Sequence, residues 1–523
     1  MSVDRMQVVK EWWRNNVNDR PAWRTEDLPE TWFKSILVAL ELAYEVRRDT
    51  IVLGKPNTEI SDLIRSYFWD IVSCVLKMYA PYTITGIAAL NAHLGNESIP
   101  KEVEVFTKSS STQIDLLGIS LLIIEKQPEL LQREDAGKYV KLINTNRNYP
   151  LTIESPESLL VRLRPRYLRD YPQVISTFLK GINFDSEILG ALLLQESRPI
   201  VYPRIAALFE QVGKDAEAEL IHSSVKIMKS YSLPGRSQIV KYPLPASIAF
   251  KARLSDPVYV TRFRDQLRVY RDRVEAELKN VKLPSWKLNE LLKYGEQTKK
   301  QDTYHSSTIE GYRVTQEEIQ ALIEGRMITE FGASKEEVER KMALKGYLEA
   351  HRFILQTIAD NFNKVTPVTE LIIREIYAHL FSPSVEAGLL TKEQLTRYRN
   401  DAIYIRNSRH VPPNYQKVDD LMRCMVEEVN EVKNQAARAL LAHYGFVTIH
   451  PYFDGNGRVA RFLMNYILSL SGIPWITIRI EDRDRYFHAL ETAQCDEDIN
   501  PFSQFLVKYL KESQKFKPPR SPR

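Results

Sequence analysis

Cysteine is scarce in this chain: there are three among 523 residues, Cys74, Cys424 and Cys495. They lie far apart, their number is odd, and none belongs to a Cys-x-x-Cys or Cys/His pattern. A disulfide framework needs paired cysteines, and a structural zinc site needs closely spaced Cys and His ligands. The sequence therefore predicts neither.

Long apolar runs are also missing. No window of about 18 apolar residues is free of charge, so we expect no membrane span. The first residues, MSVDRMQVVKEWW, contain acids and no continuous apolar stretch, which is unlike a secretory signal. We therefore expect a cytoplasmic protein that has no membrane partner.

The chain has little excess charge of either sign. Lys and Arg number 72 against 67 Asp and Glu, a net charge of +5. A balance this close to neutral gives no reason to expect nucleic acid or an anionic membrane as the main partner. The sequence also lacks a GxxxxGK[ST] loop, an HExxH pair and the set of kinase motifs, which argues against those three enzyme classes.

The length and the patterning predict several domains. Residues 1–230 mix amphipathic helical stretches with strand-like ones, so we predict an α+β N-terminal domain with a regulatory or target-recruiting role. Pro, Gly and Ser then cluster, which predicts a linker at 231–252. The stretches that carry this interpretation are helical at 31–48, 60–79 and 200–229, and strand-like at 102–108 and 118–126.

From residue 253 onward the pattern is helical almost throughout, so the predicted fold class is mainly α, with this helical domain spanning 253–511. One segment differs: 397–413 alternates β-prone residues and ends in two prolines, which predicts a β-hairpin. The polar, Pro-rich and basic residues 512–523 predict a disordered tail.

One stretch, HPYFDGNGRVAR at 450–461, combines several chemical functions. Pro451 ends a helical run, and Gly455-Asn456-Gly457 then tolerates unusual backbone angles before an apolar helix begins. Such a loop turns backbone N–H groups toward one point at the positive end of a helix. We therefore predict an anion-binding nest.

The charged residues around this loop suit a polyphosphate. Arg458 and Arg461 are three residues apart, hence on one helix face, and guanidinium forks match phosphate oxygens. Asp454 is an oxygen ligand suited to Mg²⁺, and His450 can accept a proton from a hydroxyl nucleophile. The bland alternative is a Gly-rich turn with a solvated His and Arg, which this many coincident features disfavour.

The stretch resembles the motif HxFx[D/E]GNGRxxR of the Fic (fido-fold) proteins, and the resemblance extends over about residues 290–510. Tyr452 stands where the family usually has Phe, and its ring is expected to pack the loop against the core. The resemblance implies a helical Fic catalytic domain with a β-hairpin flap. It also implies a protein adenylyltransferase that moves AMP from ATP to a Ser, Thr or Tyr hydroxyl with Mg²⁺.

The resemblance assigns roles residue by residue. His450 would deprotonate the target hydroxyl, Asp454 would hold Mg²⁺, and the two arginines would clamp the β- and γ-phosphates. The flap around 403–406 would add a target segment as a strand. Gln494 stands where relatives often have Asn. The residues so assigned to ATP binding are Glu310, Ile403, Tyr404, Ile405, Arg406, Gly455, Asn456, Gly457, Arg458, Val459, Ala460, Arg461, Tyr486 and Gln494.

The sequence SSTIEG, from Ser306 to Gly311, is similar to the family's inhibitory signature [S/T]xxxE[G/N]. The resemblance implies that Glu310 pairs with Arg461 and blocks a productive pose of ATP. The alternative is a helix-capping box formed by Ser307 and Glu310. If Glu310 also positions a water, the same site would remove AMP, so a bifunctional enzyme stays open.

Residues 1–230 carry slightly more acids than bases, and RLRPRYLR at 162–169 is their one basic cluster, interpreted as a solvated helix start. Two short segments weakly resemble AbiEi-type antitoxins. The competing hypothesis is therefore a nucleotide-sensing regulator with a DNA-binding N-terminal domain. A further one is a relative that uses another nucleotide or a phosphocholine donor. The sequence leaves homo-oligomerisation open.

Overall fold

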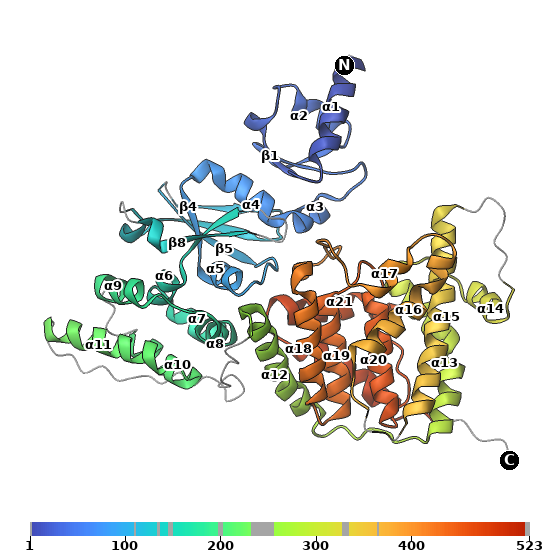
Figure 1. Cartoon of the computed structure of the whole chain (residues 1–523). Coiled ribbons are helices and arrows are strands. Elements are labelled where there is room, and N and C mark those ends of the chain that lie inside the picture. Colours follow the sequence, from blue (N-terminus) through green and yellow to red (C-terminus); the bar gives the residue numbers. More distant parts are fainter. Residues whose placement is uncertain are drawn as a thin grey trace. The chain divides into compact units, whose positions relative to one another are not determined.

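The computed structural model describes residues 3–108, 111–132, 136–144, 150–196, 202–231, 256–326, 334–362, 364 and 366–517. The chain divides into two compact units. The first holds residues 1–265 together with 403–412, and the second holds 266–402 and 413–523. Figure 1 shows that strands lie in the first unit and that the second is helical. The predicted fold class, mainly α with an α+β N-terminal domain, is confirmed.

The first unit begins with a small three-stranded antiparallel sheet in the order β1-β3-β2, covered by two helices. The helix predicted at 31–48 is only partly present, because Glu41 adopts a positive φ of 54° and ends it. The chain then continues as β2, which pairs with the β-branched strand β3. The elements are α1 (Val3–Asn16), β1 (Ala22–Arg24), α2 (Phe33–Ala39), β2 (Ala43–Arg47) and β3 (Thr50–Leu53).

A six-stranded mixed sheet follows, in the order β6-β7-β5-β4-β9-β8. The strands predicted at 102–108 and 118–126 are confirmed as β5 and β7, which pair in parallel. The strands are β4 (Tyr82–Thr85), β5 (Glu102–Thr107), β6 (Thr112–Asp115), β7 (Leu121–Lys126), β8 (Val140–Asn144) and β9 (Pro150–Glu154).

Short helices accompany this sheet and share its hydrophobic core. The helices predicted at 60–79 and 200–229 are confirmed, each as a pair. The helices that accompany the sheet are α3 (Ile60–Ser66), α4 (Phe68–Leu76), α5 (Gly86–His93), α6 (Pro156–Val161), α7 (Pro165–Asp170), α8 (Pro172–Gly181), α9 (Ser186–Glu196), α10 (Tyr202–Val212) and α11 (Asp215–Tyr231). The predicted linker at 231–252 lies almost wholly outside the described residues.

The stretch 162–169 opens α7 as the sequence suggested, and Arg169 is 72% exposed, but its other three arginines pair with buried glutamates. Arg164 Nη1 lies 3.2 Å from Glu104 Oε2, and Arg166 pairs with the other oxygen of the same carboxylate. Arg162 Nε lies 3.3 Å from Glu154 Oε1. Because both glutamates are almost fully buried, these arginines balance internal charge and are engaged within the domain.

The second unit is a bundle of helices around α20. Helix α20 packs against α13, α15, α16 and α19, and the last of these runs beside it in Figure 1. The helices are α12 (Val258–Leu278), α13 (Leu288–Ile309), α14 (Gln316–Ile323), α15 (Lys335–Asn361), α16 (Glu370–Glu386), α17 (Lys392–Thr396), α18 (Val418–Asn430), α19 (Gln435–Ile449), α20 (Asn456–Leu470), α21 (Arg483–Cys495) and α22 (Asn500–Ser513).

The segment predicted as a β-hairpin, 397–413, reverses direction but forms no strands. Asn407 has a positive φ of 59°, and the Ser408 amide donates to the Ile405 carbonyl. The backbone then bonds elsewhere: the Arg409 carbonyl accepts from the Ile99 amide at 2.8 Å. This external pairing replaces the ladder that a hairpin needs, so the prediction of paired strands is wrong.

The C-terminal tail predicted at 512–523 is described only as far as residue 517, and the first two of its residues still belong to α22. Among the described helices, none is long and apolar enough to cross a membrane.

Candidate active site

The loop between α19 and α20 carries the site. α19 ends at Ile449, and His450 then adopts the left-handed conformation with φ 53°. Gly455 is also left-handed, with φ 82°, and α20 begins at the next residue. The Asn456 side chain braces the loop, since it accepts from the Tyr452 amide and donates to the Tyr452 carbonyl. Asn456 thus shapes the nest through its side chain.

The aromatic ring of Tyr452 packs as expected. It is 2% exposed and stacks on Tyr377 with ring centroids 3.6 Å apart. Its hydroxyl has no hydrogen-bond partner among the described residues. The loop is therefore anchored to α16 by ring packing.

The His450 imidazole has a defined donor and a defined acceptor. Its Nδ1 lies 3.3 Å from the Val447 carbonyl oxygen, which can only accept, so Nδ1 carries the proton. Nε2 is then the basic nitrogen. Burial lowers the pKa of His450 to about 4, with a further lowering contribution from the charge of Arg399. The ring is therefore neutral at physiological pH, as a general base must be.

Asp454 is held at the mouth of the nest. Its Oδ1 accepts from the Gly455 amide at 2.6 Å, and its Oδ2 accepts from Arg458 at 2.8 Å. Burial raises the pKa of Asp454, but the Arg458 guanidinium and the Gly455 N–H outweigh it and hold that pKa below its usual value. The side chain is still 58% exposed, so the carboxylate is ionised and accessible.

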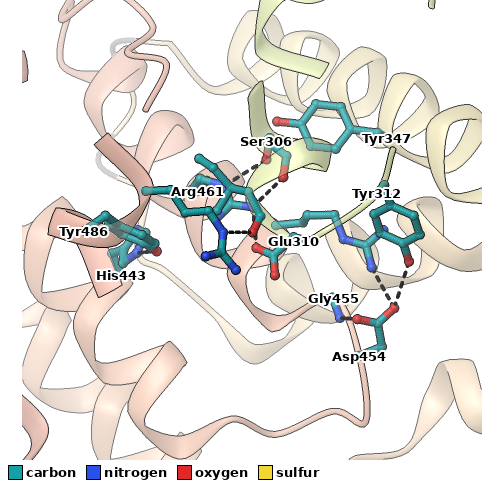
Figure 2. A network of polar contacts seen from close by, with 12 residues as sticks. Ser306, Glu310, Tyr312, Tyr347, His443, Asp454, Gly455, Arg461 and Tyr486 are labelled. Atoms are coloured by element: carbon teal, nitrogen blue, oxygen red, sulfur yellow. Dashed lines mark hydrogen bonds and ion pairs between the residues drawn. The ribbon is translucent and has the colours of Figure 1, made fainter. Parts of the chain in front are cut away.

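Arg461 is bound to the end of α13. Its Nε donates to Ser306 Oγ at 2.8 Å, and its Nη2 donates to Glu310 Oε1 at 2.6 Å and to the Ser306 carbonyl at 3.1 Å. Figure 2 shows the guanidinium turned toward both residues. The predicted pairing of Glu310 with Arg461 is thus present in the structure.

The Glu310 carboxylate also reaches the nest itself. Gly457 has no side chain, and a Cβ there would overlap Glu310 Oε1. Gly457 lies in the first turn of α20, where the backbone N–H groups are unpaired and attract anions. The carboxylate therefore occupies space beside the helix N-terminus that an anionic ligand would need.

Tyr312 lies against Arg458 and Asp454 at the candidate site. Its ring lies 5.2 Å from the Arg458 guanidinium, and its hydroxyl donates to Asp454 Oδ2 at 3.4 Å. Figure 2 shows Tyr312 facing Asp454. Sequence reasoning missed this residue, although it stands two positions after Glu310.

The capping-box alternative for Ser307 and Glu310 is excluded by the helix boundaries. A capping box opens a helix, whereas Glu310 is the C-cap of α13 and Gly311 follows with φ 93°. The end of α13 is anchored by Asp302, a buried residue that accepts from the Tyr347 hydroxyl and from Thr477 Oγ1, each at 2.7 Å.

Four of the residues that the resemblance assigns to ATP binding are buried side chains. Tyr486 is 1% exposed, and its hydroxyl lies 2.8 Å from His443 Nε2. Gln494 Nε2 donates to Thr448 Oγ1 at 3.2 Å. Val459 and Ala460 are fully buried in α20. Contacts of Tyr486 and Gln494 with ATP stay predictions.

The residues predicted to form the flap, Ile403 to Arg406, belong to the first unit. There Arg406 Nε donates to Asp62 Oδ2 at 3.0 Å, and the Tyr404 ring approaches that of Tyr67. Their part in ATP binding stays a prediction. A cavity of about 540 Å³ opens beside Asp454, lined in part by Tyr312, Phe381 and Phe453.

Comparisons with known proteins agree with the site. Residues 367–468 match the model of the Fic/DOC family. A segment of 214 residues is 32% identical to "Protein adenylyltransferase Fic" of Nematostella vectensis, covering 40% of this chain and 46% of that protein. A segment of the same length is 27% identical to "Protein adenylyltransferase fic-1" of Caenorhabditis elegans, covering 40% of this chain and 39% of that protein. The match therefore spans less than half the length of these curated relatives.

Solved structures were also matched. Fic-1 (residues 134–508) of C. elegans shares 19% identity with a TM-score of 0.36, over 68% of this chain and 93% of that one. A Fic domain containing signaling protein of Bacteroides thetaiotaomicron shares 22% with a TM-score of 0.35, over 48% and 94%. Residues 367–468, which hold the whole loop between α19 and α20, thus match a Fic/DOC domain.

Proposed function

We propose that this protein is an adenylyltransferase that moves AMP from ATP to a hydroxyl of a protein, itself included. One observation carries the proposal: a single loop joins His450, which is neutral, to the N-terminus of α20, where Asp454 pairs with Arg458 and Arg461 lies beside Gly457. A base, a metal-binding carboxylate and a phosphate clamp are the groups that this transfer needs. The relatives named adenylyltransferases support the same activity.

The chemistry divides among these residues. His450 Nε2 accepts the proton as the hydroxyl oxygen bonds to the α-phosphorus, and the bond to pyrophosphate breaks. The amides of the Gly455–Gly457 turn hold the phosphates, and Arg458 and Arg461 offset the charge of the leaving group. Positioning and charge stabilisation supply most of the acceleration.

Mg²⁺ fits the site through Asp454. The described residues contain no cluster of three His, Cys, Asp or Glu side chains that could hold a metal by themselves. Mg²⁺ in nucleotide enzymes commonly binds one or two carboxylates together with the phosphates of the substrate. The ionised and accessible Asp454 offers that carboxylate. Held by Asp454 and the substrate phosphates, Mg²⁺ would offset the negative charge of those phosphates.

The geometry supports an enzyme held at rest. Glu310 occupies Arg461 and the space beside Gly457, so a triphosphate has no open clamp. Ser306 and Gly311 belong to the same device: the first accepts from Arg461, and the second ends the helix behind Glu310. If Glu310 also positions a water molecule, the same site would remove AMP from a modified protein, and the enzyme would be bifunctional.

The test is intact-mass spectrometry of the full chain after incubation with ATP and Mg²⁺. We expect Glu310→Gly to gain the mass of AMP, and Glu310→Gly combined with His450→Ala to gain none. Glu296→Gln is the matched control, since Glu296 is an exposed residue of α13 that pairs only locally with Lys299. If Glu310→Gly stays unmodified and labels no protein while it binds ATP, the proposal is wrong. The nucleotide-sensing regulator would then be the better hypothesis.

A further inference from the structure

Arg399 is a buried arginine beside the catalytic loop. It is 3% exposed and lies in the segment that leads from α17 toward residue 403. Its Nε donates to the His450 carbonyl at 2.9 Å. Its own amide donates to the Pro451 carbonyl at 2.8 Å. One residue thus binds two consecutive carbonyls of the catalytic loop.

The other guanidinium nitrogens reach the two ends of the loop that follows. Nη1 donates to the Asp401 carbonyl at 3.0 Å, and Nη2 donates to the Pro413 carbonyl. Between these ends the chain leaves the helical unit at Ala402 and returns at Pro413. The planar guanidinium, with its fixed fork of donors, is suited to hold several acceptors in one geometry.

These contacts lie at a point where the backbone adopts an unfavourable conformation. His450 is a non-glycine residue in the left-handed region, a conformation that persists only where the surroundings impose it. The carbonyls of His450 and Pro451 follow the end of α19, where no helical partner remains for them. Arg399 donates to both of these carbonyls: its side chain to that of His450, and its main-chain amide to that of Pro451.

The cost of burying Arg399 argues that its charge has a use. Every hydrogen bond described for its side chain goes to a backbone carbonyl. Burial lowers the pKa of Arg399 to about 10, so it stays charged at neutral pH. A buried cation is expensive unless it is well bonded, and an apolar side chain would fill the same space without that cost.

We propose that Arg399 is the positioning residue of the catalytic base: it fixes the backbone of His450 and ties both ends of the 401–413 loop to the same point. The inference rests on the proposed function only for the role of His450 as a base. The hydrogen bonds described for Arg399 go to backbone carbonyls outside the Gly455–Gly457 turn and the arginine clamp, so its loss should slow transfer and leave nucleotide binding intact.

The first test is kinetic, in the full-length Glu310→Gly protein. We expect Arg399→Gln to lower kcat for AMP transfer by roughly a hundredfold, the range attributed to a well-placed base. The KM for ATP should change less than about twofold. Arg397→Gln is the matched control and should behave as its parent, because the Arg397 side chain is 74% exposed and pairs only with Glu393. Equal kcat in both variants would overturn the proposal.

The second test needs no activity. The His450 imidazole is followed by NMR in the full-length protein labelled with ¹³C-histidine, and His450→Asn assigns the signal. The charges facing this ring are Arg399, which lowers its pKa, and Asp454, which raises it. Arg399→Gln should therefore raise the pKa of His450 and shift its signal, whereas Arg397→Gln should do neither.

Arg399→Lys separates charge from geometry. It keeps the cation but cannot reach three carbonyls at once, so kcat should stay low while the pKa of His450 stays near that of the parent. An unmoved His450 signal in Arg399→Gln, with the protein folded, would overturn the inference. A parent that transfers no AMP would instead overturn the proposed function, and the NMR result would still decide the role of Arg399.

Discussion

The carboxylate of Glu310 binds the guanidinium of Arg461 at 2.6 Å, directly beside Gly457 in the first turn of α20. Both side chains are largely buried, with 23% and 5% exposed. A charge-assisted bond in such surroundings is stronger than a surface pair. Under the proposed function, ATP must therefore compete with an anion that the chain itself supplies.

Removing only the charge of Glu310 should uncover the clamp. In Glu310→Gln the side chain keeps its size, so Arg461 loses its ionic partner without leaving a cavity. We expect the Kd for ATP to fall about tenfold, which corresponds to the loss of one charge-assisted hydrogen bond. Isothermal titration calorimetry measures it, with Glu296→Gln as the control. An unchanged Kd would show that the charge of Glu310 does not oppose nucleotide binding.

Tyr312 should restrain the site independently of Glu310. Its ring covers Arg458 and its hydroxyl reaches Asp454. Tyr312→Ala in the Glu310→Gly protein should tighten ATP–Mg²⁺ binding by about threefold to tenfold, the worth of one cation–π contact. Tyr312→Phe, which keeps the ring, should give a smaller change. A weaker Kd in both variants would assign Tyr312 to nucleotide binding instead.

The pH dependence of transfer follows from His450. Burial, the largest influence, lowers its pKa to about 4, so the neutral base prevails at every pH well above that value. AMP transfer by Glu310→Gly should therefore be flat from pH 8 to about pH 5 and should fall as the imidazole protonates near pH 4. Initial rates in buffers of constant ionic strength test this. An acid limb centred near pH 6.5, the unperturbed histidine value, would contradict it.

Gly457 should tolerate no side chain. In Gly457→Ala the added Cβ would occupy the space that Glu310 Oε1 now fills. We expect this variant to lose ATP binding even when combined with Glu310→Gly, because the methyl group would stand between the helix N-terminus and a phosphate. Gly472→Ala, at a glycine just after α20, controls for general effects on stability. Retained binding in the double variant would place the phosphates elsewhere.

Much of the site could be predicted because its parts are close together in the sequence. His450, Asp454 and the two arginines lie within one short motif, and Ser306 and Glu310 lie within another. Helical periodicity likewise predicted the helices of the second unit, since most of them have one apolar face.

The parts that could not be predicted depend on contacts between distant residues. Nothing local distinguishes Arg399 from Arg397, yet one is buried against the His450 carbonyl and the other is exposed. The 397–413 segment has the alternating residues of a strand, but the Arg409 carbonyl accepts a hydrogen bond from the distant Ile99 amide. Periodicity also predicted one continuous helix at 31–48, whereas the chain turns at Glu41, which has a positive φ.

The groups that contact the arginines and Asp454 of the proposed nucleotide site lie on one short piece of chain, from Ser306 to Tyr312. Gly311 lies inside it, and nothing stands within 4 Å of the position that a Cβ would take there. A single displacement at the end of α13 would thus release Arg461, Asp454 and Arg458 together. Activation is therefore expected to be switch-like rather than graded, and any signal that moves this short piece is sufficient.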